Sequence, residues 1–533
     1  MKLGLAQINT ANGDLEGNEK KIRQYLEKAR AEKVDLLIFP ELALVGYPPR
    51  DFLDQHGYLE KVQQTAEKIA QDFTDLNFII GAAEKNHNVA HVVVGGKIIC
   101  TCRKNLLPNY DIFDERRYFK PGSEPEIVEI HGKKIGITIC EDIWADEIKL
   151  YNNDPIKMLK RQSLDLVVNI SASPFELGKY ERRVKVVSQR AQELSKSIVY
   201  VNLVGGNDEL IFDGGSFVIG SNGEIISQAP FFEEALHLCE TSASDSIPVM
   251  IAAPEEKLAQ ALTLGFRDFV RKCGFKDVTF GLSGGIDSAL ILLLAIEAVG
   301  KEHVFPIFMP SRFTSQDSKQ DVSEMIIKSG VRVTLSPITE PFEAFEKSLS
   351  SSFGETLKPL TTENIQSRIR ANILMAFSGQ RNALVINTGN KTEAAVGYCT
   401  LYGDTIGGIS PIADLYKHQV YAVAKHLNQK YNAIPSRVFT RAPSAELAPD
   451  QKDSDRLPEY EVLDPIVENY IENHENAEEL VKRGFAQKDV DQAIDLVNKA
   501  EFKRRQTAPI LRVSDKAFGT GRRMPIARRQ YDL

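Results

Sequence analysis

Residues 281–290 read "GLSGGIDSAL". An apolar run, "VTFGL" (278–282), leads into this stretch, and an apolar helical pattern, "DSALILLLAIEAVG" (287–300), follows it. A strand, a glycine turn and a helix in that order bring backbone N–H groups and the positive end of the helix dipole to one point, where an anion can bind. The stretch therefore predicts a parallel α/β domain that holds a phosphate group at the carboxyl end of a strand.

This loop lacks the lysine of the G-x-x-x-x-G-K-[ST] pattern, whose ammonium reaches the β and γ phosphates of a nucleotide. Ser283 and Ser288 offer hydroxyls, and Gly284 and Gly285 let the backbone approach a ligand closely. An ordinary strand-to-helix turn can have a similar composition. The combination of strand, paired glycines and apolar helix favours a phosphate site held by hydrogen bonds and the helix dipole.

The second half of the chain continues the α/β alternation. Apolar runs at 304–310, 332–338 and 382–388 are predicted strands, and helical patterns separate them. Strands that alternate with helices indicate a parallel sheet. Residues 442–460 are rich in Pro, Asp and Ser and predict a long loop, which in a compact domain is typical of a lid.

The first half has its own α/β pattern, with helices predicted at 18–33, 58–73 and 179–197. The predicted strands are 2–8, 35–40, 77–83, 91–102, 133–140, 164–171, 197–203 and 215–220. A stretch of small and polar residues follows this pattern and has the composition of a linker. The sequence therefore predicts one domain over 1–240, a linker over 241–257 and a second domain over 258–533.

Composition and charge exclude several classes of protein. The net charge is −8, which is not that of a general nucleic-acid or membrane-surface binder. Apolar runs stay well below the roughly 18 residues of a membrane span, and the N-terminus turns polar after one short apolar stretch, unlike a signal peptide. We therefore expect a cytoplasmic protein. The basic stretch 501–530 keeps a nucleic-acid reading open, although it lacks the interleaved aromatic residues of single-strand binders.

The metal-binding residue types show no zinc pattern. Six cysteines form no C-x-x-C pair, and nine histidines show no H-E-x-x-H spacing. The cysteines are therefore expected to be reduced thiols of an intracellular protein.

Three polar residues of the first half stand at the ends of predicted strands: Glu41, Lys104 and Cys140. Such ends meet at one edge of a sheet, so a carboxylate, an ammonium and a thiol can converge. The carboxylate can serve as general base, and a nearby ammonium favours the thiolate over the thiol. Taken singly, Cys140 is typical of a core residue and Lys104 of a solvated turn.

The pattern S-G-G-x-D-S resembles the signature of the ATP pyrophosphatases, which cleave ATP between the α and β phosphates and adenylate a substrate oxygen. Within that group, residues 387–420 ("NTGNKTEAAVGYCTLYGDTIGGISPIADLYKHQV") and 363–375 ("ENIQSRIRANILM") are similar to the NAD synthetases. The resemblance implies a Rossmann-like parallel-sheet domain that binds ATP and deamido-NAD.

The resemblance also implies roles for individual residues. Asn364, Glu393 and Lys503 would contact deamido-NAD, and Asp287 and Glu393 would hold Mg²⁺, which prefers carboxylate and phosphate oxygens. The implied ATP-binding residues are Gly281, Leu282, Ser283, Gly284, Gly285, Ile286, Asp287, Ser288 and Thr388. Taken alone, Thr388 and Lys503 could equally be surface polar residues.

Three stretches of the first half, "FPELALVGYPPRD" (39–51), "RKNLLPNYDIFDE" (103–115) and "ICEDIW" (139–144), resemble the nitrilase superfamily. They are most similar to the glutamine-hydrolysing domain that is fused to some NAD synthetases. The resemblance implies a four-layer αββα sandwich. It assigns Glu41 as base, Lys104 as the group that stabilises the oxyanion and Cys140 as nucleophile.

The same resemblance implies the glutamine contacts. Tyr110, Ser173 and Lys179 would hold the substrate, although arginine is common in the family where Lys179 stands. The backbone N–H of Glu141 would be a second oxyanion donor, and Glu115 an additional carboxylate.

Together the two halves imply one reaction, the last step of NAD biosynthesis. Deamido-NAD, ATP and glutamine would give NAD, AMP, pyrophosphate and glutamate, with ammonia passing between the two sites. Enzymes of this kind form homo-oligomers, either dimers through the synthetase domain or larger assemblies. Other amidotransferases, tRNA-modifying ATP pyrophosphatases, a nucleic-acid binder and a catalytically inactive nitrilase scaffold remain alternative readings of the sequence.

Overall fold

The structure is a computed structural model that describes residues 1–241, 246–248 and 252–527. The chain divides into two compact units, Met1–Ile251 and Ala252–Leu533. Part of the predicted linker, 241–257, lies outside the described residues.

The first unit is built on two six-stranded sheets. Its strands are β1 (Lys2–Gln7), β2 (Leu36–Ile38), β3 (Phe78–Glu84), β4 (His87–Val94), β5 (Lys97–Arg103), β6 (Glu126–Ile130), β7 (Lys133–Ile139), β8 (Leu166–Ser171), β9 (Ser197–Asn202), β10 (Val204–Asn207), β11 (Leu210–Asp213), β12 (Phe217–Ile219), β13 (Ile225–Gln228) and β14 (Ala235–Glu240). Its helices are α1 (Leu15–Ala31), η1 (Arg50–Asp54), α2 (Tyr58–Asp72), α3 (Glu115–Tyr118), η2 (Cys140–Ile143), α4 (Pro155–Leu159) and α5 (Lys179–Leu194).

The two sheets have similar topology. The strand orders are β14-β1-β2-β3-β4-β5 and β13-β12-β9-β8-β7-β6. In each sheet three consecutive strands are parallel: β1, β2 and β3 in one, and β7, β8 and β9 in the other. Parallel strands end at the same edge, which places the segments after β2 and β7 where functional residues can gather.

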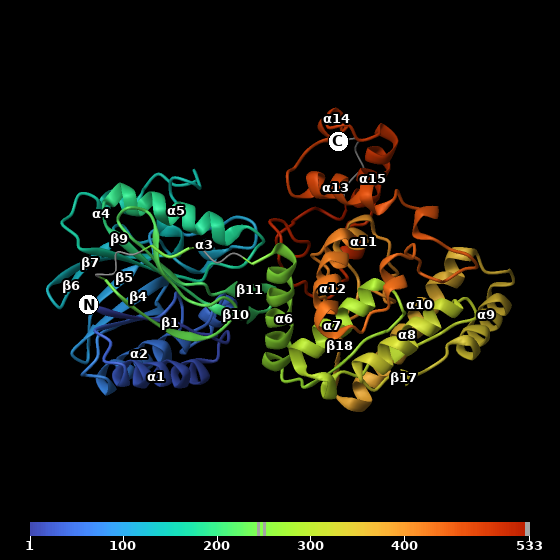
Figure 1. Ribbon diagram of the computed structural model, residues 1–533, viewed down its shortest axis with the longest axis horizontal. Helices are drawn as coiled ribbons and strands as arrows, with labels where there is room; N and C mark the ends of the chain where they lie inside the picture. The colour runs from blue at the N-terminus through green and yellow to red at the C-terminus, as the bar shows by residue number, and fades with distance from the viewer. Residues whose placement is uncertain (242–245, 249–251, 528–533) are drawn as a thin grey trace. The chain divides into compact units, whose positions relative to one another are not determined.

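Apolar side chains fill three layers of the first unit. Leu5, Ile38 and Val168 belong to the core that the two sheets share. Ile22 of α1 packs on the outer face of one sheet, and Val187 of α5 packs on the outer face of the other. Figure 1 shows α1 and α2 on one side of the sheets and α4 and α5 on the opposite side. The expected αββα sandwich is therefore present.

One predicted strand was wrong. The run 91–102 is not a single strand but the hairpin of β4 and β5, which pair antiparallel. Gly95 and Gly96 form the turn with φ of 56° and 79°, a left-handed conformation that suits glycine. The continuous apolar pattern hid this turn, because apolar residues stand on both sides of the two glycines.

A buried ion pair joins α5 to the strand end of β11. Arg183 Nη1 donates to both carboxylate oxygens of Asp213, at 2.7 and 2.8 Å. The same guanidinium donates to the carbonyls of Ser173 and Pro174 at 3.0 and 2.9 Å, and to Ser173 Oγ at 3.1 Å. Arg183 therefore fixes the segment that carries Ser173.

The second unit combines short parallel strands with many helices. Its strands are β15 (Asp277–Thr279), β16 (Ile307–Phe308), β17 (Thr334–Leu335) and β18 (Ala383–Val385). Its helices are α6 (Pro254–Lys272), α7 (Ile286–Val299), η3 (Lys301–His303), α8 (Gln316–Ser329), α9 (Thr339–Phe353), α10 (Pro359–Arg381), α11 (Lys391–Val396), α12 (Lys417–Tyr431), η4 (Ser436–Phe439), η5 (Asp453–Asp455), α13 (Tyr460–Ile471), α14 (Ala477–Lys482), α15 (Gln487–Lys499) and α16 (Glu501–Arg504).

The strands of this unit form the expected parallel arrangement. β15 pairs with β18, β16 pairs with β17, and a parallel bridge between Gly281 and Ile307 connects the two pairs. α7 begins directly beyond β15 and is buried on nearly all sides, as its apolar sequence predicts. The carboxyl end of β15 therefore leads into the glycine loop and the N-terminus of α7, as a Rossmann-like fold requires.

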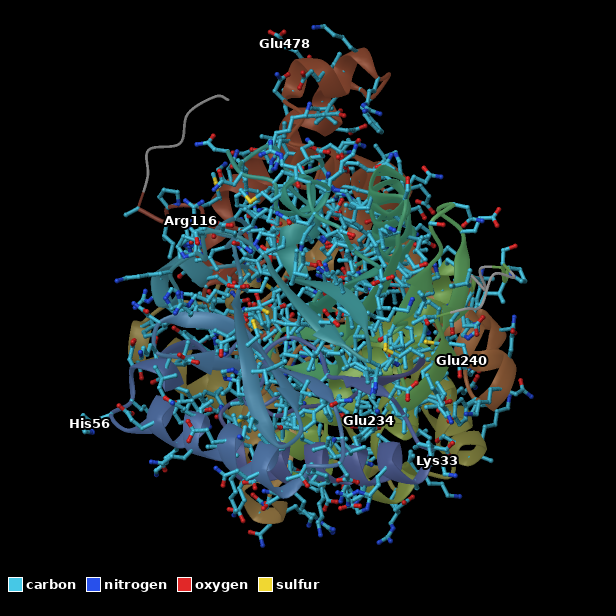
Figure 2. The ribbon with its side chains drawn as sticks, turned by 90° about the vertical axis from the view of Figure 1, so that its left-hand side faces the viewer. Lys33, His56, Arg116, Glu234, Glu240 and Glu478 are labelled. Atoms are coloured by element: carbon cyan, nitrogen blue, oxygen red, sulfur yellow. The ribbon has the colours of Figure 1, made fainter. Side chains whose placement is uncertain are left out.

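Polar and charged side chains lie at the surface of the first unit. Figure 2 shows His56 projecting from its edge, and Lys33 and Glu240 are exposed as well. Among the described residues, no helix has the length and apolar character needed to cross a membrane.

We predict that Asp213→Ala destabilises the first unit by about 3–5 kcal/mol, because it leaves the guanidinium of Arg183 buried without its counter-charge. Trp144 lies in this unit and is the only tryptophan of the chain, so its fluorescence during urea denaturation reports the unfolding of this unit.

Lys185→Ala is the matched control, because this residue of α5 is exposed. We expect it to change the free energy of unfolding by no more than about 1 kcal/mol. Equal effects of the two substitutions would contradict the importance of the buried pair.

Candidate active sites

A buried ammonium joins two carboxylates in the first unit. Lys104, directly after β5, donates from Nζ to Glu41 Oε1 at 2.7 Å and to Glu115 Oε1 at 2.7 Å. Glu41 lies shortly after β2, and Cys140 comes directly after β7. Glu41 and Lys104 are almost completely buried. The structure thus brings Lys104 together with both Glu41 and Glu115, and Cys140 lies close enough to interact electrostatically with all three.

The carboxylates of Glu41 and Glu115 each accept further hydrogen bonds. Glu41 accepts from Asn88 Nδ2 at 2.7 Å and from the backbone N–H of Ala172 at 2.8 Å. Glu115 Oε1 also accepts from the hydroxyl of Tyr47 at 2.8 Å. Burial raises the pKa of Glu115 to about 7, although Lys104 opposes that shift. Burial alone would lower the pKa of Lys104, but the two carboxylates outweigh it and hold that pKa well above its usual range.

Cys140 turns the chain from β7 into η2 with a left-handed φ of 44°, which is strained for a residue other than glycine. Burial raises the pKa of its thiol well above the usual value, Glu41 raises it further, and Lys104 only partly offsets them. Lys104 thus favours the thiolate, as expected, but burial and Glu41 outweigh it, so the pKa of the thiol is raised overall.

Asp142 connects the segments of Lys104 and Cys140 and was missed by the sequence reasoning. Its carboxylate accepts the backbone N–H groups of Asn105 at 2.9 Å, Leu106 at 2.8 Å and Ile139 at 3.0 Å. Burial raises its pKa to about 6, against these backbone donors. The only signal in the sequence is its place two residues after Cys140.

The residues expected to hold glutamine lie on segments around this site. The hydroxyls of Tyr110 and Tyr151 both donate to Glu141 Oε1, at 3.0 and 2.7 Å. Lys179 donates to Glu176 Oε1 at 3.0 Å and lies 5.7 Å from the centre of the Trp144 ring. Ser173 receives the hydrogen bond from Arg183 described above. Tyr151 had not been predicted.

In the second unit the glycine loop has the form of an anion site. Ser283 Oγ lies 3.1 Å from Ser288 Oγ and accepts the backbone N–H of Gly285 at 3.2 Å. Gly284 has a φ of +88°, and a Cβ at that position would lie 2.9 Å from the carbonyl oxygen of Ser318. Glycine is therefore required there, both for the backbone angle and for the space.

A second buried ammonium lies beside this loop. Lys417 Nζ donates to Asp287 Oδ2 at 2.6 Å and to Glu393 Oε1 at 3.2 Å. Asn390 Nδ2 donates to Asp287 Oδ1 at 2.9 Å. Burial raises the pKa of Glu393 to about 8, although Lys417 opposes the shift. Lys417 lies in the stretch 387–420 that resembles the NAD synthetases, but the sequence did not predict it as a site residue.

The two carboxylates suit a magnesium ion. Asp287 and Glu393 are hard oxygen donors, and one ammonium does not neutralise both of them, which is consistent with the raised pKa of Glu393. Among the described residues, no group of three or more His, Cys, Asp or Glu side chains comes together to hold a metal by itself. Phosphate oxygens of a nucleotide would have to supply the remaining ligands.

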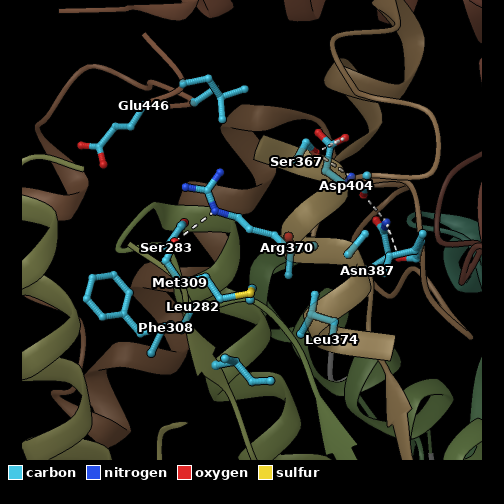
Figure 3. Close-up of a pocket in the computed structure, with 18 of the residues that line it drawn as sticks. Leu282, Ser283, Phe308, Met309, Ser367, Arg370, Leu374, Asn387, Asp404 and Glu446 are labelled. Carbon is cyan, nitrogen blue, oxygen red and sulfur yellow. Dashed lines mark hydrogen bonds between the residues drawn. The ribbon is translucent and has the colours of Figure 1, made fainter. Parts of the chain in front are cut away.

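A cavity adjoins the glycine loop and contains Thr388 (Figure 3). Leu282, Met309 and Leu374 give it apolar walls. Arg370 of α10 extends into it toward Ser283 and donates from Nε to the carbonyl of Met309 at 3.1 Å. Burial lowers the pKa of Arg370 to about 10. An apolar cavity next to a phosphate loop, with one buried cation, can hold a nucleotide.

A neighbouring cavity is lined by the charged side chains of Asp287, Glu393 and Lys417. Ser283 lines both cavities. The loop over 442–460 borders both of them through Ala445 and Glu446. Glu446 accepts from Ser318 Oγ at 2.8 Å, which holds the loop against α8. The segment that the sequence predicted as a lid therefore covers the expected site.

Asn364 and Lys503 both contact the segment that follows α11. Asn364 Oδ1 accepts from Thr400 Oγ1 at 2.7 Å. Lys503 Nζ donates to the carbonyls of Gly397 and Cys399, both at 2.7 Å. The structure thus brings these two predicted residues to one short segment, close in the chain to Glu393.

Two protein families match the chain. Residues 2–247 match the carbon-nitrogen hydrolase family, and residues 258–507 match the NAD synthase family. Together these matches confirm the fold class expected for each half.

Relatives match the chain over its whole length. A glutamine-dependent NAD(+) synthetase of Synechocystis is 42% identical and covers 98% of each chain, and one of Thermotoga maritima is 39% identical and covers 99% of each. The solved structure of a glutamine-dependent NAD(+) synthetase from Acinetobacter baumannii, in complex with adenosine diphosphate, is 37% identical, covers 98% of each chain and has a TM-score of 0.78. A synthetase structure from Cytophaga hutchinsonii, 22% identical with a TM-score of 0.85, supports the fold.

The raised pKa of Cys140 leads to a prediction about its reactivity. Only a thiolate reacts with iodoacetamide, so alkylation of Cys140 in the free protein should be slow at pH 7 and become faster continuously through pH 9. Mass spectrometry of the Cys140 peptide measures the rate, and the exposed Cys273 in the same sample is the internal reference. A rate that reaches its plateau below pH 8 would show a resting thiolate.

Proposed function

The chain belongs to the glutamine-dependent NAD(+) synthetase family, and we propose that its two units divide that reaction as their sites suggest. The first unit hydrolyses glutamine to glutamate and ammonia. The second adenylates deamido-NAD with ATP and transfers ammonia to it, which gives NAD, AMP and pyrophosphate. One observation carries this division: each unit contains its own buried ammonium–carboxylate site, beside a thiol in the first and beside a phosphate loop in the second.

In the proposed glutaminase, Cys140 Sγ attacks the carboxamide carbon of glutamine and its proton passes to Glu41. That proton then goes to the departing nitrogen, which leaves as ammonia. Water then attacks the thioester carbon while Glu41 accepts a proton from it; the carbon–sulfur bond breaks, Glu41 returns the proton to Cys140 Sγ, and glutamate is released. Lys104 and the backbone N–H of Glu141 stabilise the oxyanion of each tetrahedral intermediate.

The remaining residues of this unit would bind the substrate. We propose that Tyr110, Ser173 and Lys179 hold glutamine and that Glu115 keeps Lys104 charged and in place. The contact of 2.7 Å between Glu115 and Lys104 supports the second role.

In the proposed synthetase, residues 281–288 and Thr388 bind ATP. The carboxylate oxygen of deamido-NAD attacks the α phosphorus, and pyrophosphate leaves. Ammonia then attacks the adenylated carboxyl carbon, and AMP leaves. The adenosine diphosphate bound to the Acinetobacter relative is consistent with an adenine-nucleotide site in this family.

Asn364, Glu393 and Lys503 would contact deamido-NAD. Asp287 and Glu393 would hold Mg²⁺, which neutralises charge on the nucleotide phosphates when bound. The carboxylate pair and the raised pKa of Glu393 support this choice of ligands.

We further propose that the glutaminase spans 1–240, the linker 241–257 and the synthetase 258–533, and that the enzyme is cytoplasmic. We also propose a homo-oligomer, a dimer formed through the synthetase unit or a larger assembly; Phe345 and Phe353 of α9 and Met375 of α10 are exposed apolar side chains of that unit which such a contact could bury. Analytical ultracentrifugation tests this, and a single species at the mass of one chain would contradict it.

The reaction is tested by incubating the protein with deamido-NAD, ATP, Mg²⁺ and glutamine and identifying the products. We expect NAD and AMP, with glutamate and NAD formed in similar amounts if ammonia passes directly between the sites. ADP in place of AMP would contradict adenylation.

In the same assay Cys140→Ala should lose synthesis from glutamine and keep synthesis from added ammonia, because the thiol serves only the glutaminase. Equal loss of both activities would contradict the separation of the sites.

Asp287→Ala should lose synthesis from glutamine and from ammonia alike, by about 100-fold or more, because it removes one carboxylate from Lys417 and from the expected Mg²⁺ site. Glutamine hydrolysis at Cys140 is measured separately and should persist. Glu297→Ala is the control, since this residue of α7 contacts Lys430 and Tyr431, away from the glycine loop. Survival of ammonia-driven synthesis in Asp287→Ala would remove Asp287 from the proposed site.

A further inference from the structure

A buried carboxylate on α13 connects the two helices that carry Glu393 and Lys417. Asp464 Oδ1 accepts from Thr392 Oγ1 at 2.5 Å. Its other oxygen, Oδ2, accepts the backbone N–H of His418 at 2.9 Å and lies 3.0 Å from His418 Nδ1. Asp464 itself is 2% exposed. Both oxygens of one carboxylate therefore bind residues that are immediate neighbours of predicted or observed site residues.

Thr392 completes this connection. Its hydroxyl donates to Asp464 and accepts the backbone N–H of Lys417 at 3.1 Å. Thr392 directly precedes Glu393 in α11, and His418 directly follows Lys417 in α12. One short chain of hydrogen bonds thus runs from Asp464 to the backbone on either side of the ion pair between Glu393 and Lys417.

We propose that Asp464 is a positioning residue for the adenylation site: it fixes the starts of α11 and α12 so that Glu393 and Lys417 stay in place around Asp287. This inference rests on the proposed function of the second unit. Asp464 touches none of the reacting groups, and its effect passes through Thr392 and His418.

The starts of α11 and α12 need hydrogen-bond partners from outside each helix. α11 has six residues, which is too short to be stable by its own hydrogen bonds. The first N–H groups of α12 have no partner inside that helix, and those of Lys417 and His418 are satisfied by Thr392 and Asp464. The negative charge of Asp464 at this N-terminus also suits the helix dipole.

Other contacts should keep the unit folded without Asp464. Lys391, at the start of α11, donates to Asp414 at 2.9 Å and to Glu472 at 2.7 Å. Arg504 donates to the carbonyl of Ala395 near the end of the same helix. Loss of Asp464 therefore loosens the orientation of Glu393 and Lys417 more than it affects the fold, which separates a positioning role from a structural one.

The decisive variant is Asp464→Asn, which keeps the shape and removes one acceptor. An amide NH₂ cannot accept a hydrogen bond, so either the Thr392 hydroxyl or the backbone N–H of His418 loses its acceptor, and the negative charge at the start of α12 is lost as well. Ammonia-driven synthesis is measured to bypass the glutaminase. We expect kcat to fall by about 10- to 100-fold, as for other displaced site groups, with a smaller change in the KM for ATP, because the glycine loop and the nucleotide cavity are unaltered.

Matched variants identify the connection. Thr392→Ser keeps the hydroxyl and should retain nearly full kcat, whereas Thr392→Val removes it and should lose kcat as Asp464→Asn does. Glu468→Gln, one turn further along α13, removes a charge that acts on His418 without touching Thr392 and should be close to wild type. Thermal unfolding of each variant corrects kcat for the folded fraction.

The outcomes separate this inference from the proposed function. If wild type forms no AMP, the proposed function fails. If wild type forms AMP but Asp464→Asn keeps its kcat within about twofold, or Thr392→Val matches Thr392→Ser, the positioning role is wrong. A fall in kcat that is fully explained by the folded fraction would equally overturn it, since that is the behaviour of a structural contact.

Discussion

In each unit a buried lysine ammonium lies between two carboxylates, and the chemistry proposed for both sites depends on this arrangement. In the first unit Lys104 contacts Glu41 and Glu115. Three buried charges are costly to desolvate, and two carboxylates with one ammonium leave a net negative charge. Burial, with a smaller contribution from Glu41, raises the pKa of Glu115 to about 7. In the proposed reaction Glu41 takes up the proton of Cys140, which reduces the negative charge beside Lys104 while the sulfur bonds to the substrate carbon.

In the second unit one buried ammonium again lies between two carboxylates, but beside a glycine loop and not beside a thiol. Lys417 contacts Asp287 and Glu393, and the pKa of Glu393 is raised to about 8. Here the excess negative charge faces a phosphate loop, where a divalent cation bound with a nucleotide would compensate it. The two units have different folds, so the feature they share is the arrangement itself: one buried lysine ammonium held between two carboxylates.

The sequence predicted the folds and the residues that directly follow strands, because strand ends share an edge of a sheet. Glu41 and Lys104 could be found in this way. Lys417 could not, because its partner Asp287 is 130 residues away and no local pattern links them. The raised pKa of Cys140 was also beyond the sequence, since it depends on how burial and the nearby carboxylates, Glu41 foremost, outweigh one ammonium. The hairpin of β4 and β5 was missed because its apolar run continues across the turn.

Rigid placement explains why so many polar contacts of the second unit serve one short helix. Lys391 holds the start of α11, Asp464 holds Thr392, and Lys503 and Arg504 hold the carbonyls at its end. A six-residue helix has little stability of its own, so each of these contacts reduces the freedom of Glu393 before any substrate binds. Binding energy is then not consumed in ordering the site, and it remains available to align ammonia and the adenylated carboxyl group.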